Sequence, residues 1–213
     1  MVIFIYNNDT TNKMDTKTRK TLYFCLGVIA VLLIYFLFFA KPSYDDVLNP
    51  KPIKGNEEAT VKIVEFSDLQ CPACGAAHPI TKQILNEFGD QVSLEYKHFP
   101  LTSIHFFAFD AAAASECAND QGKFWEYVDI AFVNQDALQK NNLAKYAEQL
   151  NLNMDSFNAC FKSEAKEKYV RADINEGLGK DLQGTPSFFI NGEKLDSWEF
   201  ENFKEAVEAA LAE

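Results

Sequence analysis

The sequence predicts an α/β domain preceded by a single transmembrane helix. Two observations support this fold class: a long uncharged segment near the N-terminus, and short β-branched runs beyond it that alternate with amphipathic helical patterns. The order is strand–helix–strand, a long helical segment, then two strands and a final helix. The 213 residues are 47% apolar, with 7 Pro and 9 Gly, which excludes a disordered or low-complexity chain.

The uncharged segment runs from Thr21 to Ala40 and is rich in Leu, Ile, Val and Phe. A helix of this length spans about 30 Å, the thickness of the hydrocarbon core of a bilayer. The segment lacks the polar stripe of a buried helix in a soluble domain. A cleaved signal peptide is the alternative, but its apolar core is usually shorter, and bulky Phe38 stands where a small residue precedes a cleavage site. We therefore expect an uncleaved anchor at residues 21–40.

Basic side chains are concentrated just before this segment. They are Lys13, Lys17, Arg19 and Lys20. The positive-inside rule predicts that residues 1–20 lie in the cytoplasm and that the C-terminal domain lies outside it, at the cell membrane. An ordinary anchor sequence starts at Met14, which we expect to be the true initiator. The net charge of −11 argues against nucleic acid as a partner, because phosphate contacts need clustered basic side chains.

The C-terminal domain is predicted at residues 59–213, after a linker at 41–58 that holds three of the prolines. Its first part shows a strand, a helix and a strand, which make a βαβ unit with a right-handed crossover. They are predicted at Thr60–Phe66, Cys71–Phe88 and Gln91–Phe99. Residues 103–182 then show helical periodicity throughout.

The last part of the chain predicts a hairpin and a helix. Ser187–Ile190 is a short apolar strand, Asn191-Gly192 is a strong turn signal, and Glu193–Leu195 returns as the second strand. Ser197 is predicted to cap a final amphipathic helix.

The chemistry of the domain is predicted to lie at Cys71-Pro-Ala-Cys74. Two cysteines three residues apart at a helix start can close a small disulfide loop. The unpaired N–H groups of the first helical turn stabilise the thiolate of the first one, so we assign Cys71 as the exchanging sulfur and Cys74 as the resolving thiol. Half of a zinc site, with His78 or His98 as further ligands, is the alternative. The sequence has no second Cys-x-x-Cys and no His-x-x-x-His to complete it.

Three motifs resemble the DsbA-like branch of the thioredoxin superfamily. They are Val64-Glu-Phe-Ser-Asp-Leu-Gln-Cys-Pro-Ala-Cys74, Gln121-Gly-Lys-Phe-Trp-Glu126 and Gly184-Thr-Pro-Ser-Phe-Phe-Ile-Asn-Gly192. The resemblance covers residues 50–212 and implies a thioredoxin-like fold with an inserted helical subdomain. It also implies thiol:disulfide exchange with no external cofactor and no metal.

The resemblance assigns roles to three further residues. Glu65 would be a buried acid that relays protons for the thiols; the alternative is an edge-strand glutamate that faces solvent. Thr185 and Pro186 would form a cis-proline loop against the cysteines, whose backbone pairs with an extended substrate. An ordinary proline at a strand start is the alternative there.

Three cysteines remain. Cys117 and Cys160 both lie on apolar faces of the predicted helices, and some members of the family staple this subdomain with a disulfide, which we expect here. Two buried free thiols and a second redox relay are the alternatives. Cys25 lies in the predicted span, where packing is its expected role.

Together these features predict a membrane-tethered oxidase that introduces disulfides into reduced substrate proteins outside the cytoplasm. A quinone-linked reoxidase of the DsbB or VKOR type would restore its disulfide. A reductase or isomerase of the same fold is the enzymatic alternative, since the Pro-Ala dipeptide lacks the histidine of the strongest oxidants and Thr185 occupies a position where isomerases also carry threonine. A non-catalytic peptide-binding module is the third reading.

Overall fold

The computed structural model describes residues 22–23, 25–29 and 52–213. The chain divides into two units, residues 1–48 and 49–213. In the first, the described residues are helical and their side chains, including that of Cys25, are exposed. Among the described residues, none of the helices has the length and apolar character needed to cross a bilayer. Most of the predicted span, the predicted cytoplasmic tail with Met14, and the first part of the linker lie outside the described residues.

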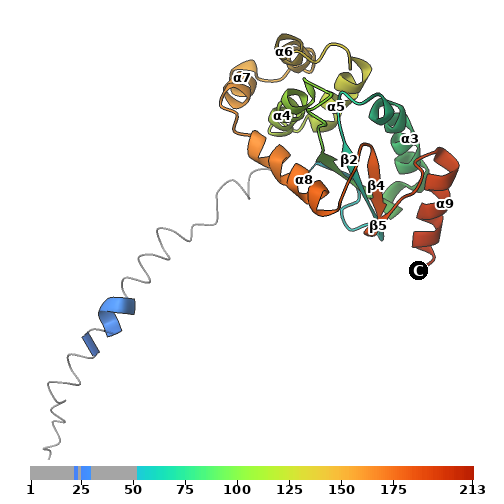
Figure 1. The fold of residues 1–213 in the computed structure, drawn as a ribbon, viewed down its shortest axis with the longest axis horizontal. Coiled ribbons are helices and arrows are strands. Elements are labelled where there is room, and N and C mark those ends of the chain that lie inside the picture. Colours follow the sequence, from blue (N-terminus) through green and yellow to red (C-terminus); the bar gives the residue numbers. More distant parts are fainter. Residues whose placement is uncertain (1–21, 24, 30–51) are drawn as a thin grey trace, which may run out of the picture. The chain divides into compact units, whose positions relative to one another are not determined.

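The second unit is built on a five-stranded sheet with the order β1-β3-β2-β4-β5 (Figure 1). The strands are β1 Ile53–Gly55, β2 Val61–Ser67, β3 Val92–His98, β4 Ser187–Ile190 and β5 Glu193–Lys194. The central pair β2–β3 is parallel and the other pairs are antiparallel. The predicted strand–helix–strand unit is therefore present, since α3, Pro72–Phe88, connects β2 to β3.

The prediction of a linker is wrong at its C-terminal end. Ile53–Gly55 form β1, which pairs with β3. Without β1 the backbone groups of this edge of β3 would have no strand partner, and a short strand is a common way to cover such an edge. The proline-rich composition of the segment concealed these three residues.

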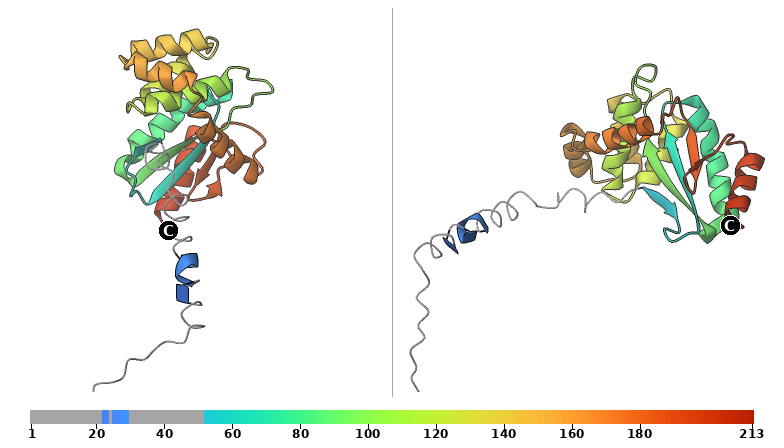
Figure 2. Two further views of the ribbon diagram at one scale, coloured as in Figure 1. Left: turned by 90° about the vertical axis from the view of Figure 1, so that its left-hand side faces the viewer. Right: turned by 60° about the horizontal axis from the view of Figure 1, so that its bottom comes forward.

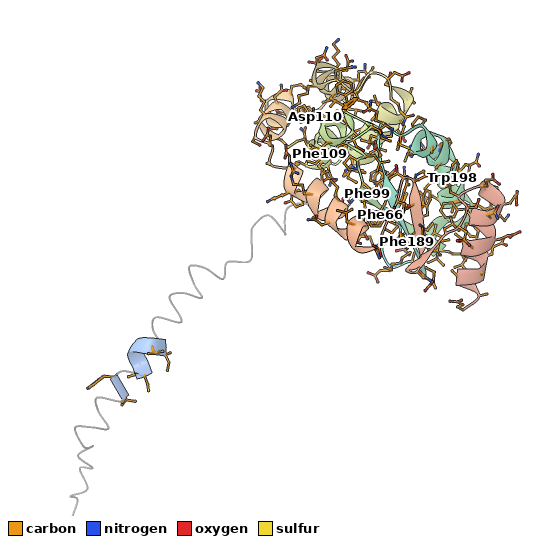
Figure 3. The ribbon with its side chains drawn as sticks, in the orientation of Figure 1. Phe66, Phe99, Phe109, Asp110, Phe189 and Trp198 are labelled. Carbon is orange, nitrogen blue, oxygen red and sulfur yellow. A yellow bond between two sulfur atoms is a disulfide. The ribbon has the colours of Figure 1, made fainter. Side chains whose placement is uncertain are left out.

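Helices cover both faces of the sheet (Figure 1). On one face, α3 and α9 (Phe200–Leu211) bury Ile63 and Phe188. On the other, Phe66, Phe99 and Phe189 form a second core, and their labelled rings lie together in Figure 3. Phe66 contacts each of the other two rings edge to face, at 6.4 and 5.9 Å between centroids.

Five helices fill the segment between β3 and β4, which matches the predicted helical insertion at residues 103–182. They are α4 Ala108–Asn119, α5 Phe124–Val133, α6 Lys140–Gln149, α7 Met154–Lys162 and α8 Glu167–Gly179. Figure 2 shows α4 to α7 gathered at one end of the sheet. A disulfide between Cys117 of α4 and Cys160 of α7 links two of them, with an S–S distance of 2.02 Å.

The prediction that Ser197 caps the last helix is wrong. Helix α9 begins at Phe200, with Glu199 as its N-cap residue. The Ser197 hydroxyl accepts a hydrogen bond from the Glu199 N–H at 3.3 Å, so it closes a local turn two residues ahead of the helix. The predicted apolar face of the helix is correct, since Phe203 and Val207 are fully buried.

We predict that removal of the α4–α7 disulfide by the double substitution Cys117→Ala/Cys160→Ala lowers the free energy of unfolding by about 4 kcal/mol. The sequence separation of 43 residues closes a long loop in the unfolded chain, which is the basis of this magnitude. Urea unfolding of both proteins, each with the Cys71–Cys74 pair in the same redox state, measures the difference. Equal unfolding midpoints would contradict the prediction.

Candidate active site

The two cysteines of the motif lie where β2 leads into α3. Cys71 is the N-cap residue of the helix and Pro72 follows at its first position, where the missing proline N–H removes no helical hydrogen bond. Both residues are free thiols in the structure. Cys71 is 7% exposed and Cys74 is fully buried, so only the first sulfur is accessible to a second protein.

The surroundings of the two sulfurs shift their pKa values in opposite directions. A hydrogen bond from the Cys74 thiol is the main reason that the pKa of Cys71 falls to about 5; Thr185 and the backbone N–H groups of Ala73 and Cys74 add to this, against the effect of burial. Burial raises the pKa of Cys74 far above its usual range, and the hydrogen bond that it donates to Cys71 raises it further. At neutral pH the site therefore presents one thiolate and one thiol.

The predicted cis-proline loop lies against these cysteines. The Thr185-Pro186 peptide bond is cis. The Cys71 sulfur lies 3.5 Å from the Thr185 carbonyl oxygen, which accepts a hydrogen bond from Cys71 when this residue is protonated. The loop connects α8 to β4, so residues more than one hundred positions apart in the sequence meet at the reactive sulfur.

Glu65 is 1% exposed, so the alternative in which this side chain faces solvent is wrong. It lies in the middle of β2, paired in register with Tyr96 of β3 and Phe188 of β4. Burial raises the pKa of its carboxyl to about 7, although the Ser67 hydroxyl acts in the opposite direction. A carboxyl with this pKa holds a proton in about half of the molecules at neutral pH.

Asp68 holds the loops around the cysteine motif together through hydrogen bonds that the sequence did not reveal. Its buried carboxylate accepts hydrogen bonds from the N–H groups of Gln70 and Leu101, at 2.7 and 2.8 Å, and one oxygen lies 2.7 Å from Nδ1 of His105. Its own N–H points to the Cys74 sulfur at 3.4 Å. The hydrogen bond from the Gln70 N–H to Asp68 closes an Asx turn. An Asp at the start of a turn is a sequence signal for this motif.

Gln135, beyond the end of α5, is a further site residue that the sequence did not identify. Its side-chain amide donates to the carbonyls of Leu69 and Cys71, at 3.0 and 2.7 Å. A side chain at Gly75 would collide with it, since an added Cβ would lie 2.5 Å from the Gln135 oxygen. The helical insertion thus fixes the backbone on both sides of the reactive sulfur.

The histidines do not complete a zinc site with the cysteines. Nε2 of His78 lies 2.6 Å from Asp129, and Nε2 of His98 lies 3.3 Å from both Ser115 and Glu116. Over the described residues, no three His, Cys, Asp or Glu side chains gather as metal ligands. His78 is half-buried against the Phe132 ring rather than solvated.

Two hollows, each of about 400 Å³, open beside the cysteine motif. One follows the cis-proline loop and the turn after β5, with Trp198 at its border. The other lies between Pro72 and the end of α5, where the Val133 side chain is 84% exposed. A peptide that reaches Cys71 could extend into the recess along the cis-proline loop or into the one next to Pro72.

The family model described as Thioredoxin matches residues 48–209. The chain belongs to the thioredoxin family. The predicted thioredoxin-like fold with its helical insertion is thereby confirmed.

Solved structures of DsbA-like proteins share this fold. Oxidised BdbD from Bacillus subtilis superposes with a TM-score of 0.68 at 23% identity, over 76% of this chain and 94% of BdbD. A thioredoxin-like oxidoreductase from Silicibacter pomeroyi gives 0.69 at 21% identity, over 80% and 99%. The thiol-disulfide exchange protein alpha-DsbA2 from Wolbachia pipientis gives 0.67 at 19% identity, over 78% and 91%.

Curated relatives match by sequence over part of their length. One is the Na(+)/H(+) antiporter NhaA 1 of Salinispora arenicola, 35% identical over 161 residues, which are 75% of this chain and 24% of the relative. NhaA 3 of Salinispora tropica matches to the same extent. This chain spans about a quarter of the length of these relatives, so their named activity does not transfer to it.

We predict that the thiolate absorbance of Cys71 in the reduced protein titrates with a midpoint at about pH 5. Cys74→Ala should move the midpoint up toward the ordinary value of 9.0, because it removes the largest stabilising contact. Between these two pH values Cys71 is a thiolate in the folded protein and a thiol in the unfolded chain. The stability that the wild type gains over Cys71→Ser is therefore full above pH 9.0, declines as the pH falls and is lost by about pH 5. A wild-type midpoint near 9.0 would contradict the prediction.

Proposed function

We propose that this protein is a thiol:disulfide oxidoreductase that introduces disulfides into secreted or surface proteins outside the cytoplasm. The observation that carries the proposal is the arrangement at the start of α3, where Cys71 is the N-cap residue, lies 3.5 Å from the Thr185 carbonyl of the cis-proline loop and is followed by the fully buried Cys74. Family membership and the DsbA-like fold agree with it. Its substrates are reduced proteins with cysteines, and its chemistry needs no cofactor beyond the cysteine pair.

The reaction begins with the Cys71–Cys74 disulfide. A substrate thiolate attacks the Cys71 sulfur, the bond between Cys71 and Cys74 breaks, and Cys74 leaves with the electron pair and takes up a proton. A second substrate thiolate then attacks the substrate sulfur of the mixed disulfide, and Cys71 leaves as a thiolate. The substrate has lost two electrons and gained a disulfide, and the protein holds a dithiol.

The acidity of Cys71 supports the oxidising direction. A thiolate stable at pH 5 is a good leaving group, and its stability favours the reduced protein over the disulfide form. The Thr185 carbonyl beside Cys71 is a backbone group with which an extended substrate could pair. Glu65 is the proposed source of the proton that Cys74 receives.

We further propose that the domain acts at the cell membrane, tethered through residues 21–40 with the N-terminus in the cytoplasm. A quinone-linked reoxidase of the DsbB or VKOR type would accept the two electrons of the dithiol. The uncharged segment and its basic flank support this arrangement. A tether keeps the domain close to such a membrane partner.

The test is oxidative refolding of a reduced, denatured substrate protein whose native form contains one disulfide. The oxidised wild type should restore the activity of this substrate faster than buffer alone, and Cys71→Ser should not. Cys25→Ser is the matched control, since it removes a cysteine that lies in the other unit of the chain. Wild type that fails to accelerate refolding would contradict the proposed oxidase activity.

A further inference from the structure

Four buried polar side chains lie together behind the cysteine motif. Glu65 and Ser67 are two residues apart on β2, so both point to the face of the sheet that α3 covers. Tyr96 is the register partner of Glu65 on the neighbouring strand and shares that face. Cys74 lies in the first turn of α3, the helix that covers this face. Each of the four is at most 1% exposed.

Most of the polar atoms in this cluster lack an ordinary hydrogen bond. Within the described part of the chain, both oxygens of Glu65 and the hydroxyls of Ser67 and Tyr96 have no partner of standard geometry. Buried polar groups in folded proteins are paired in the great majority of cases, so a group of adjacent exceptions needs an explanation, and a catalytic role is one such explanation. The Thr185 hydroxyl, beside the cysteines, is a further exception.

Ser67 lies on β2 one same-face position beyond Glu65, at the end of the strand that leads to the cysteine motif. Against the effect of burial, its hydroxyl acts to lower the pKa of the Glu65 carboxyl, of the Tyr96 phenol and of the Cys74 thiol. The Ser67 and Tyr96 hydroxyls can each donate one hydrogen bond and accept another at the same time, and Ser67 is the one on the same strand as Glu65. Tyr96 stays protonated, because burial raises its pKa well above the usual range.

We propose that the Ser67 hydroxyl passes the proton between the Glu65 carboxyl and the Cys74 sulfur. This inference rests on the function proposed above and adds a residue to it. When the Cys71–Cys74 bond breaks, Cys74 leaves with the electron pair. Ser67 donates its hydroxyl proton to that sulfur and takes the proton of Glu65. The products are a Cys74 thiol, an intact serine and a Glu65 carboxylate.

Other groups face this path and would influence its pH dependence. Cys71 lies on α3 beside Cys74, and Asp68 in the preceding loop directs its N–H at the Cys74 sulfur. The His98 ring lies against the Tyr96 ring at 5.2 Å. The Asp68 carboxylate accepts hydrogen bonds from two N–H groups and lies 2.7 Å from Nδ1 of His105, so both of its oxygens already have partners.

The test measures, as a function of pH, the single-turnover rate at which dithiothreitol reduces the Cys71–Cys74 disulfide. Each rate is divided by the concentration of dithiothreitol thiolate at that pH, so that the ionisation of the reductant does not contribute to the profile. In the wild type this normalised rate should fall as the pH rises through about 7, where Glu65 loses its proton. Ser67→Ala should be about tenfold slower below that pH and should lack the step. Ser67→Thr, which keeps a hydroxyl, should restore the step.

Two further variants separate a proton path from a packing effect. If Ser67 acts through Glu65, the double variant Ser67→Ala/Glu65→Gln should be no slower than either single variant. Thr81→Val removes another buried hydroxyl, one that donates to the Ala77 carbonyl within α3, and should keep the wild-type profile. A wild-type pH step in Ser67→Ala, or rate losses that multiply in the double variant, would overturn the inference. A wild-type disulfide that exchanges with dithiothreitol but does not support refolding would instead contradict the proposed function.

Discussion

The hydrogen bond from the Cys74 thiol to the Cys71 sulfur is the interaction on which the rest of the site depends. It makes the largest contribution to the low pKa of Cys71, and it adds to the burial that keeps Cys74 protonated. The same contact therefore distinguishes a reactive sulfur from a resolving one. It requires that one sulfur be partly accessible and the other fully buried, and the fold provides this difference within four residues.

The helical insertion is what buries the pair. Cys71, Cys74 and Tyr96 belong to the same apolar core as residues of α4 to α7, rather than to the core between the sheet and α9. Gln135 adds polar contacts from the same side, to the carbonyls of Leu69 and Cys71. The sheet thus positions the motif at the end of β2, and the insertion sets its exposure and its hydrogen bonds.

Much of this arrangement could be predicted because its signals are local. The β-branched runs predicted the central strands, and the cysteine spacing at a strand–helix junction predicted the reactive pair. The roles of Pro186 and Glu65 came from the family resemblance and remain proposals. The disulfide between Cys117 and Cys160 was expected on the same basis, and the structure contains it.

The features that escaped prediction depend on contacts between distant residues. Gln135 lies 66 positions from Leu69, and His105 lies 37 from Asp68, and neither residue carries a local signal for its partner. The strand β1 is too short for its own periodicity and forms because β3 offers a free edge. Ser197 had the right residue type for a helix cap, but a local turn uses its hydroxyl.

The central claim is that the surroundings of Cys71 make the disulfide an oxidant. Its reduction potential, measured by equilibration with glutathione and quantified from the fraction reduced, tests this most directly. The account predicts a value above about −150 mV, since stabilisation of the Cys71 thiolate favours the dithiol. A value near about −270 mV would contradict it and would indicate a reductase.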